Sequence, residues 1–155
     1  MGSKAEAKEK VTKMLTQGLG INVTLTKNED LMIDVAGPDA DDISTNAYIS
    51  FDQFDGKNGT VSWVQISAPI LREVPESEEL YKWIAVAGTS FRIGCVEAFP
   101  QDNGTVFLRY KYALLADYLD EAELENALYS VLLTADELDD DLQTKFGGKR
   151  YVDQD

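Results

Sequence analysis

The clearest hydrophobic pattern lies in the last third of the chain. Apolar residues recur there at helical spacing, at Leu124, Leu128, Val131, Ala135, Leu138, Leu142 and Phe146. Asp120 and Glu123 provide an N-terminal cap, and Gly147-Gly148 ends the pattern. From Tyr112 to Thr144 there are ten carboxylates and no Lys or Arg. The pattern predicts an acidic amphipathic helix, which is a packing and partner element rather than a reaction centre.

The N-terminal residues predict a helix followed by a hairpin. Residues 3–19 keep one face apolar, begin with Ser3 and Glu6 at capping-box spacing, and end at Gly18 and Gly20. Residues 21–26 alternate between apolar and polar side chains, which indicates a strand. A polar turn at residues 27–30 then connects this strand to a returning strand at residues 31–35.

The middle of the chain predicts four further strands and one helix. Residues 47–51 and 60–71 form strands joined by a Gly-rich turn at residues 55–59. Pro75 and the acidic residues after it predict the start of a helix that Gly88 ends. Residues 91–99 and 105–114 predict a hairpin whose link carries Asn103-Gly104.

The expected order of elements is α-β-β-β-β-α-β-β-α. Because mostly tight turns join the strands, the sheet should be antiparallel, and the fold class is α+β with an antiparallel sheet flanked by helices. The chain of 155 residues is long enough for one core. We therefore predict a single domain over residues 1–155, with an ordered core over 3–148 and a polar tail over 149–155.

Composition narrows the range of partners. The formal charge is −14, from 14 basic and 28 acidic residues. This charge repels phosphate groups, so we expect neither nucleic-acid nor membrane binding. The first ten residues are charged and lack the apolar region of a secretory signal, and no run approaches the roughly 18 apolar residues of a membrane span. The expected location is the cytoplasm.

No residue pattern indicates catalysis. The chain has no His, which removes the commonest general base, and its one cysteine, Cys95, lies in a predicted strand. We interpret Cys95 as a buried small hydrophobic residue. There is no Gly-rich phosphate loop and no zinc-ligand spacing, so we predict no enzyme, no cofactor and no metal site. A hydrolase that uses paired carboxylates stays open as an alternative, although no pair stands out from the acidic background.

The short middle helix has too much apolar surface for one buried stripe. Its apolar residues are Leu80, Tyr81, Trp83, Ile84 and Val86. A helix of this kind favours a second packing layer, such as another copy of the chain.

Three segments resemble one known family. They are residues 68–75 (APILREVP), residues 104–110 with 115–120 (GTVFLRY and LADYLD), and residues 134–142 with 146–148 (TADELDDDL and FGG). Together they resemble the YbjN-type proteins, as found in actinobacteria, a family similar in fold to the class I type III secretion chaperones. The resemblance covers roughly residues 42–148, and its most specific part is the end of the acidic helix at Lys145-Phe146-Gly147-Gly148.

The resemblance implies a homodimeric α+β sandwich that binds an extended segment of a client protein and does not catalyse a reaction. It implies dimer-interface candidates on the middle helix and the following strand, at Trp83, Ile84 and Ile93. It implies client-groove candidates on the first helix and first hairpin, at Met14, Leu15, Val23 and Met32. YbjN-type proteins are also described as sensory-transduction regulators. The alternative is therefore a signalling or stress-response regulator that binds a folded partner.

Overall fold

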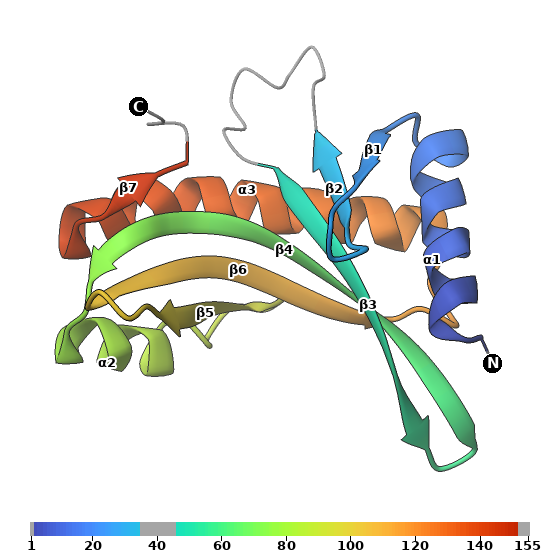
Figure 1. Cartoon of the computed structure of the whole chain (residues 1–155), viewed down its shortest axis with the longest axis horizontal. Helices are drawn as coiled ribbons and strands as arrows, with labels where there is room; N and C mark the ends of the chain where they lie inside the picture. The colour runs from blue at the N-terminus through green and yellow to red at the C-terminus, as the bar shows by residue number, and fades with distance from the viewer. Residues whose placement is uncertain (1, 35–45, 152–155) are drawn as a thin grey trace.

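The computed structural model describes residues 2–34 and 46–151, which form an antiparallel sheet with helices packed on it (Figure 1). The elements in chain order are α1 (Lys4–Lys13), the π-helical turn η1 (Met14–Gly18), β1 (Asn22–Leu25), β2 (Leu31–Asp34), β3 (Ala47–Gly56), β4 (Gly59–Pro75), α2 (Glu78–Val86), β5 (Cys95–Pro100), β6 (Thr105–Leu115), α3 (Glu121–Phe146) and β7 (Lys149–Arg150). The predicted fold class, α+β with an antiparallel sheet flanked by helices, is confirmed.

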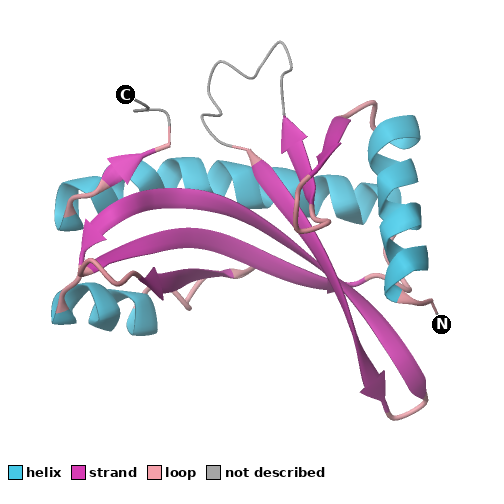
Figure 2. Ribbon diagram, viewed as in Figure 1, coloured by secondary structure: helices cyan, strands magenta, loops and turns pink. Residues whose placement is uncertain are grey.

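The sheet has the strand order β1-β2-β3-β4-β6-β5, and β7 pairs with β4. Each neighbouring pair is antiparallel. The long, curved strands β4 and β6 form its centre, and α3 runs along the sheet (Figure 2). The β3–β4 hairpin extends away from the body of the molecule as a two-stranded ribbon that Gly56 and Gly59 close (Figure 1).

The N-terminal helix begins with the predicted capping box. The Ser3 hydroxyl accepts a hydrogen bond from the Glu6 backbone N–H at 3.3 Å, and the Glu6 carboxylate accepts one from the Ser3 N–H at 2.6 Å. The helix then widens into η1, where the Leu19 N–H donates to the Met14 carbonyl at 2.9 Å. Ala7, Val11 and Leu15 turn inward and join the core.

The acidic helix α3 supplies much of the core. Asp120 caps it as predicted, by accepting a hydrogen bond from the Glu123 N–H at 2.8 Å. The buried members of the predicted stripe are Leu124, Leu128, Val131, Ala135 and Leu142. Burying each leucine contributes about 2 kcal/mol, which offsets the cost of ordering the helix. Within the described residues, no helix has the length and apolarity to cross a membrane.

Two predicted boundaries are wrong because neighbouring side chains and strands decide them. Pro75 does not start a helix but is the last residue of β4, where it pairs with Thr105 of β6. The helix α2 starts at Glu78, because the Ser77 hydroxyl caps it by accepting from the Leu80 N–H at 3.1 Å. The strand predicted at residues 91–99 begins only at Cys95.

The predicted polar tail also begins differently. Lys149 and Arg150 form β7, which pairs with Arg72 and Leu71 of β4. This pairing brings the C-terminal end of the described chain back onto the sheet. The predicted end of the second strand, Val35, lies outside the described residues.

Candidate functional site

The two faces of the sheet differ in character. One face holds the core, with Ile49, Ile66 and Tyr112 in one register row. The side chains of the alternate rows point to the other face, which we call the open face: Tyr48, Ser67, Lys111 and Cys95 in one row, Ser50, Gln65 and Ala113 in the next, and Pro69, Arg109 and Glu97 in a third. Most of these residues keep some exposure to solvent, so the open face is available to a partner.

An ion-pair cluster occupies the β5–β6 side of the open face. The Glu97 carboxylate accepts from Arg109 Nε at 2.6 Å and pairs with Lys111 Nζ. Burial opposes ionisation of Glu97, but the hydrogen bonds from Lys111 and Arg109 outweigh it, so the pKa of Glu97 lies below its usual value. The Arg109 guanidinium also lies over the Phe99 ring, 4.6 Å from its centroid.

A pocket of about 230 Å³ lies beside this cluster. It is lined by Asp30, Tyr48, Ser50, Ser67, Pro69, Phe107, Arg109 and Tyr151. The Tyr151 ring packs edge-on against Phe107, with centroids 6.0 Å apart. Burial, and next the neighbouring Tyr48, raise the pKa of Tyr151, while Arg72 opposes this shift. The pocket therefore combines aromatic walls with hydroxyl groups and a guanidinium.

The two outermost strands, β1 and β5, have no further strand partner among the described residues. Exposed apolar side chains belong to these strands or precede them in the sequence. Leu25 of β1 is 59% exposed, Val86 at the end of α2 is 69% exposed, and Ile93 just before β5 is 40% exposed. A free strand edge next to apolar side chains is a surface on which proteins bind an extended segment or another sheet.

The four client-groove candidates do not lie on one surface. Leu15 is completely buried in the core, so it offers no surface to a client, and its assignment is corrected. Met14 and Val23 are half-buried on η1 and β1, which pack against each other. Met32 pairs with Tyr48 and points to the open face, opposite to Val23. The elements that carry Met14 and Val23 are therefore in contact, whereas Met32 lies on the other face of the sheet.

The three dimer candidates lie at the α2–β5 end of the sheet. Trp83 and Ile84 are partly buried against their own core. Ile93 lies before β5 rather than in it, and its carbonyl accepts a hydrogen bond from the Tyr110 hydroxyl. Among the described residues of this region, Val86 and Ile93 are the large apolar side chains that stay exposed.

Cys95 is in a strand as predicted, but it is half-exposed on the open face rather than buried. It pairs with Lys111 across β5 and β6. Among residues 2–34 and 46–151, no group of three or more acidic or cysteine side chains is placed to hold a metal ion.

The sequence patterns did not identify Phe107, Arg109 or Tyr151 as candidate site residues. The alternation in residues 105–114 could have identified Phe107 and Arg109, since it places them on the face opposite to Val106 and Leu108. Nothing in the local sequence indicates that Tyr151 returns to the sheet.

The comparisons with known proteins identify the class and then the family. The chain matches the family model described as "T3SS (YopN, CesT) and YbjN peptide-binding chaperone 1", TY-Chap1, over residues 5–154. It therefore belongs to this family of peptide-binding chaperones, and the resemblance to YbjN-type proteins is confirmed.

A solved structure supports the fold. The chain is similar to the crystal structure of YbjN from E. coli, described as a candidate transcription regulator, with a TM-score of 0.59. The two sequences are 12% identical, and the match covers 89% of this chain and 92% of that chain. At this identity the likeness concerns the fold alone. No curated protein matches the chain.

Proposed function

We propose that this protein is a non-enzymatic chaperone or adaptor that binds a peptide segment of a client protein and acts as a homodimer. The family match over residues 5–154 carries the proposal. The outer edges of β1 and β5, which pair with no further strand among the described residues, support it, because strand addition at an edge is a common way to hold an extended segment. The formal charge of −14 favours clients with basic segments.

We place the client groove at η1 and β1. Met14 and Val23 offer half-buried apolar surface there, and Leu25 adds a side chain that is 59% exposed. An extended segment that pairs with β1 would lie next to these three residues. Met32 belongs to the open face and would contact a client only if the segment continued around the edge of the β1–β2 hairpin.

We place the dimer interface at the α2–β5 end of the sheet. Ile93 and Val86 supply exposed apolar surface there, whereas Trp83 and Ile84 pack α2 against the core of its own chain. Pairing of two β5 edges would bury this surface and remove the exposed edge.

The experiment that tests the client groove is capture of partners by the tagged full-length chain from its own host at low salt, with identification by mass spectrometry. We expect one polypeptide in comparable amount, protected from protease over a short extended segment. Met14→Asp and Leu25→Asp should release it. Leu133→Asp is the matched control, because Leu133 is 49% exposed on α3, away from the groove. Retention of the client by both groove variants would contradict this placement.

The description of YbjN as a candidate transcription regulator favours one alternative, a regulatory protein that binds a folded partner. Direct contact with DNA is disfavoured by the charge of −14. A captured partner that stays resistant to protease over a whole domain would support this alternative over the chaperone.

A further inference from the structure

The C-terminal strand β7 is bound to the sheet in the manner of a short peptide. β3 pairs with β4 only as far as Ser67, and β7 pairs with β4 at Leu71 and Arg72. Residues 68–70 of β4 lie between these two partners and have no strand partner on that side among the described residues. Because β6 occupies the other edge of β4 at Leu71, β3 and β7 lie on the same edge, and since both run antiparallel to β4 they point the same way.

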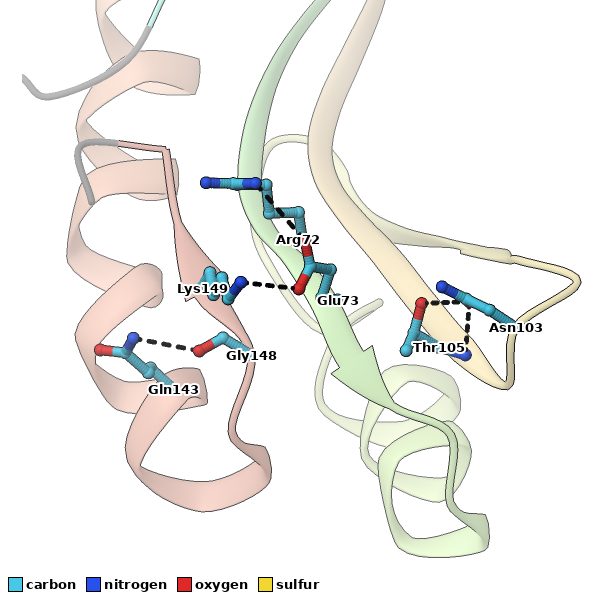
Figure 3. A network of polar contacts seen from close by, with 7 residues as sticks. All are labelled: Arg72, Glu73, Asn103, Thr105, Gln143, Gly148 and Lys149. Carbon is cyan, nitrogen blue, oxygen red and sulfur yellow. Dashed lines mark hydrogen bonds and ion pairs between the residues drawn. The ribbon is translucent and has the colours of Figure 1, made fainter. Parts of the chain in front are cut away.

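Polar side-chain contacts link β7 and Gly148 to β4 and α3. Lys149 Nζ pairs with the Glu73 carboxylate at 3.0 Å, and Gln143 Nε2 of α3 donates to the Gly148 carbonyl at 3.2 Å (Figure 3). Arg150 pairs with Asp140 of α3 at 2.6 Å, but the Asp140 side chain is 76% exposed. Exposed ion pairs of this kind contribute about 1 kcal/mol or less, and a strand of two residues adds little pairing.

One aromatic side chain anchors this segment. The residue after β7 is Tyr151, whose ring packs on Phe107 and lines the pocket on the open face. Tyr151 also lines a second hollow together with Arg72, Glu73 and Phe107. Backbone pairing, two basic side chains opposite carboxylates, and one aromatic anchor are the parts with which a sheet edge recognises an extended peptide.

We infer that this edge of β4 is a second strand-binding site, and that Lys149-Arg150-Tyr151 occupies it as an internal competitor. The external ligand is an extended segment with two basic residues followed by an aromatic residue. Its basic residues replace Lys149 and Arg150 opposite Glu73 and Asp140, and its aromatic ring replaces Tyr151 on Phe107. A longer segment could also pair with residues 68–70, which neither β7 nor any other described strand pairs with on this edge. The inference rests on the proposed function because it takes the ligand to be a peptide.

The internal competitor sets how tightly an external peptide binds. The apparent affinity is lowered by the fraction of molecules in which the site is occupied by β7. Weakening β7 should therefore strengthen external binding without any change in the site itself. Because ion pairs contribute, external binding should also weaken as salt is added.

The test uses a fluorescein-labelled peptide with the sequence of residues 147–151, added to the full-length protein at low salt and followed by fluorescence anisotropy. We expect weak binding to the unaltered protein and binding at least about tenfold tighter to Tyr151→Ala. A peptide with Ala in place of its tyrosine should lose binding. Phe107→Ala, introduced into the Tyr151→Ala protein, should abolish binding of the original peptide.

A charge exchange separates a local effect from a loss of folding. Glu73→Lys in the Tyr151→Ala protein should reject the original peptide and accept one with Glu in place of its lysine, because the ion pair is then reversed. Circular dichroism confirms that each variant is folded. Equal affinity of the Tyr151→Ala and unaltered proteins, or binding that is indifferent to Phe107→Ala, would overturn the inference.

The outcome also separates this inference from the proposed function. A captured client that depends on Met14 and Leu25 but not on Phe107 or Tyr151 leaves the proposed function standing and removes the second site. The expected peptide response without any captured client supports the second site and removes the placement of the client groove at η1 and β1.

Discussion

Trp83 and Phe146 lie edge to face, with ring centroids 6.3 Å apart and planes inclined at 64°. This contact joins α2 to the end of α3, two elements that are far apart in the sequence. Trp83 therefore attaches α2 to its own chain, whereas Val86 and Ile93 stay exposed, as the proposed dimer interface requires. The family resemblance implied that Trp83 is a dimer candidate, and the structure gives it a packing role within the protomer.

Replacing Trp83 should destabilise the protomer, whatever its state of association. Trp83→Ala removes the ring contact and part of the packing of α2, and we expect a loss of about 2 kcal/mol in the free energy of unfolding. Urea unfolding at two protein concentrations measures this loss. Val86→Glu is the matched control: it should leave the stability of the protomer unchanged and shift the proposed dimer toward monomer in sedimentation. Unchanged stability of Trp83→Ala would contradict the role of this contact.

Two glycines with almost the same backbone angle should respond differently to alanine. Gly94 has φ of 74° and Gly104 has φ of 76°. A Cβ on Gly94 would lie 2.3 Å from the Lys111 carbonyl oxygen, whereas one on Gly104 would meet nothing within 4 Å. Gly104→Ala should therefore cost only about 1 kcal/mol for the left-handed backbone, and Gly94→Ala clearly more than about 2 kcal/mol. Thermal unfolding of both variants checks this, and equal losses would refute it.

Asp139 should make the protein less stable as the pH rises, which is opposite to the usual effect of a carboxyl group. It is only 7% exposed on α3. Burial first, and then Asp136 and Asp140, raise its pKa from 3.8 to about 6, against a smaller opposing effect of Arg150. The pKa of Asp139 is higher in the folded protein than in the unfolded chain. Protonated Asp139 therefore stabilises the folded protein below about pH 4, and this stabilisation is lost as the pH rises through about 6.

Asp139→Asn removes the free-energy cost of ionising this buried carboxyl group at neutral pH. At pH 7.5 the variant should be more stable by up to about 3 kcal/mol, and the gain should fade toward pH 4. Urea unfolding across this range measures both effects. Asp141→Asn is the control, since the Asp141 side chain is 74% exposed. A gain that does not vary with pH would exclude Asp139 as its source.

Glu97 should show the opposite dependence on pH. Its pKa is lowered, so the stability it contributes is present above its ordinary pKa of 4.5 and is lost as the pH falls through the lower, folded value. Glu97→Gln removes the charge partner of Arg109 and Lys111, and we expect a loss of about 1 kcal/mol at neutral pH that disappears in acid. The same measurement on Glu9→Gln, whose pair with Lys13 is exposed, should show almost no change. Equal losses in the two variants would contradict the prediction.

The local elements were predictable because their signals lie within a few residues. The Ser3–Glu6 capping box and the Asp120 cap each depend on side chains three residues apart. The stripe of α3 repeats at helical spacing, and the Gly-rich turn at residues 55–59 closes its hairpin with local backbone geometry. These features also fixed the fold class, since tight turns leave neighbouring strands no arrangement but an antiparallel one.

The candidate sites were less predictable because their parts come from distant segments. The family resemblance implied that Leu15 lines a client groove, yet the core of the sheet buries it completely. Cys95 looked buried in its strand, yet the register turns it to the open face beside Lys111. Which face of each strand is covered depends on where α1 and α3 pack, and no single strand carries that information.

The sequence alone therefore determined the helices, the turns, the antiparallel sheet and the acidic character of α3, all of which follow from short-range periodicity, capping and charge. Only the tertiary structure decided that residues 149–150 pair with β4 and that Tyr151 reaches Phe107. A strand of two residues has no periodicity of its own. Its place is set by carboxylates and an aromatic pocket that the rest of the fold assembles from β4, β6 and α3.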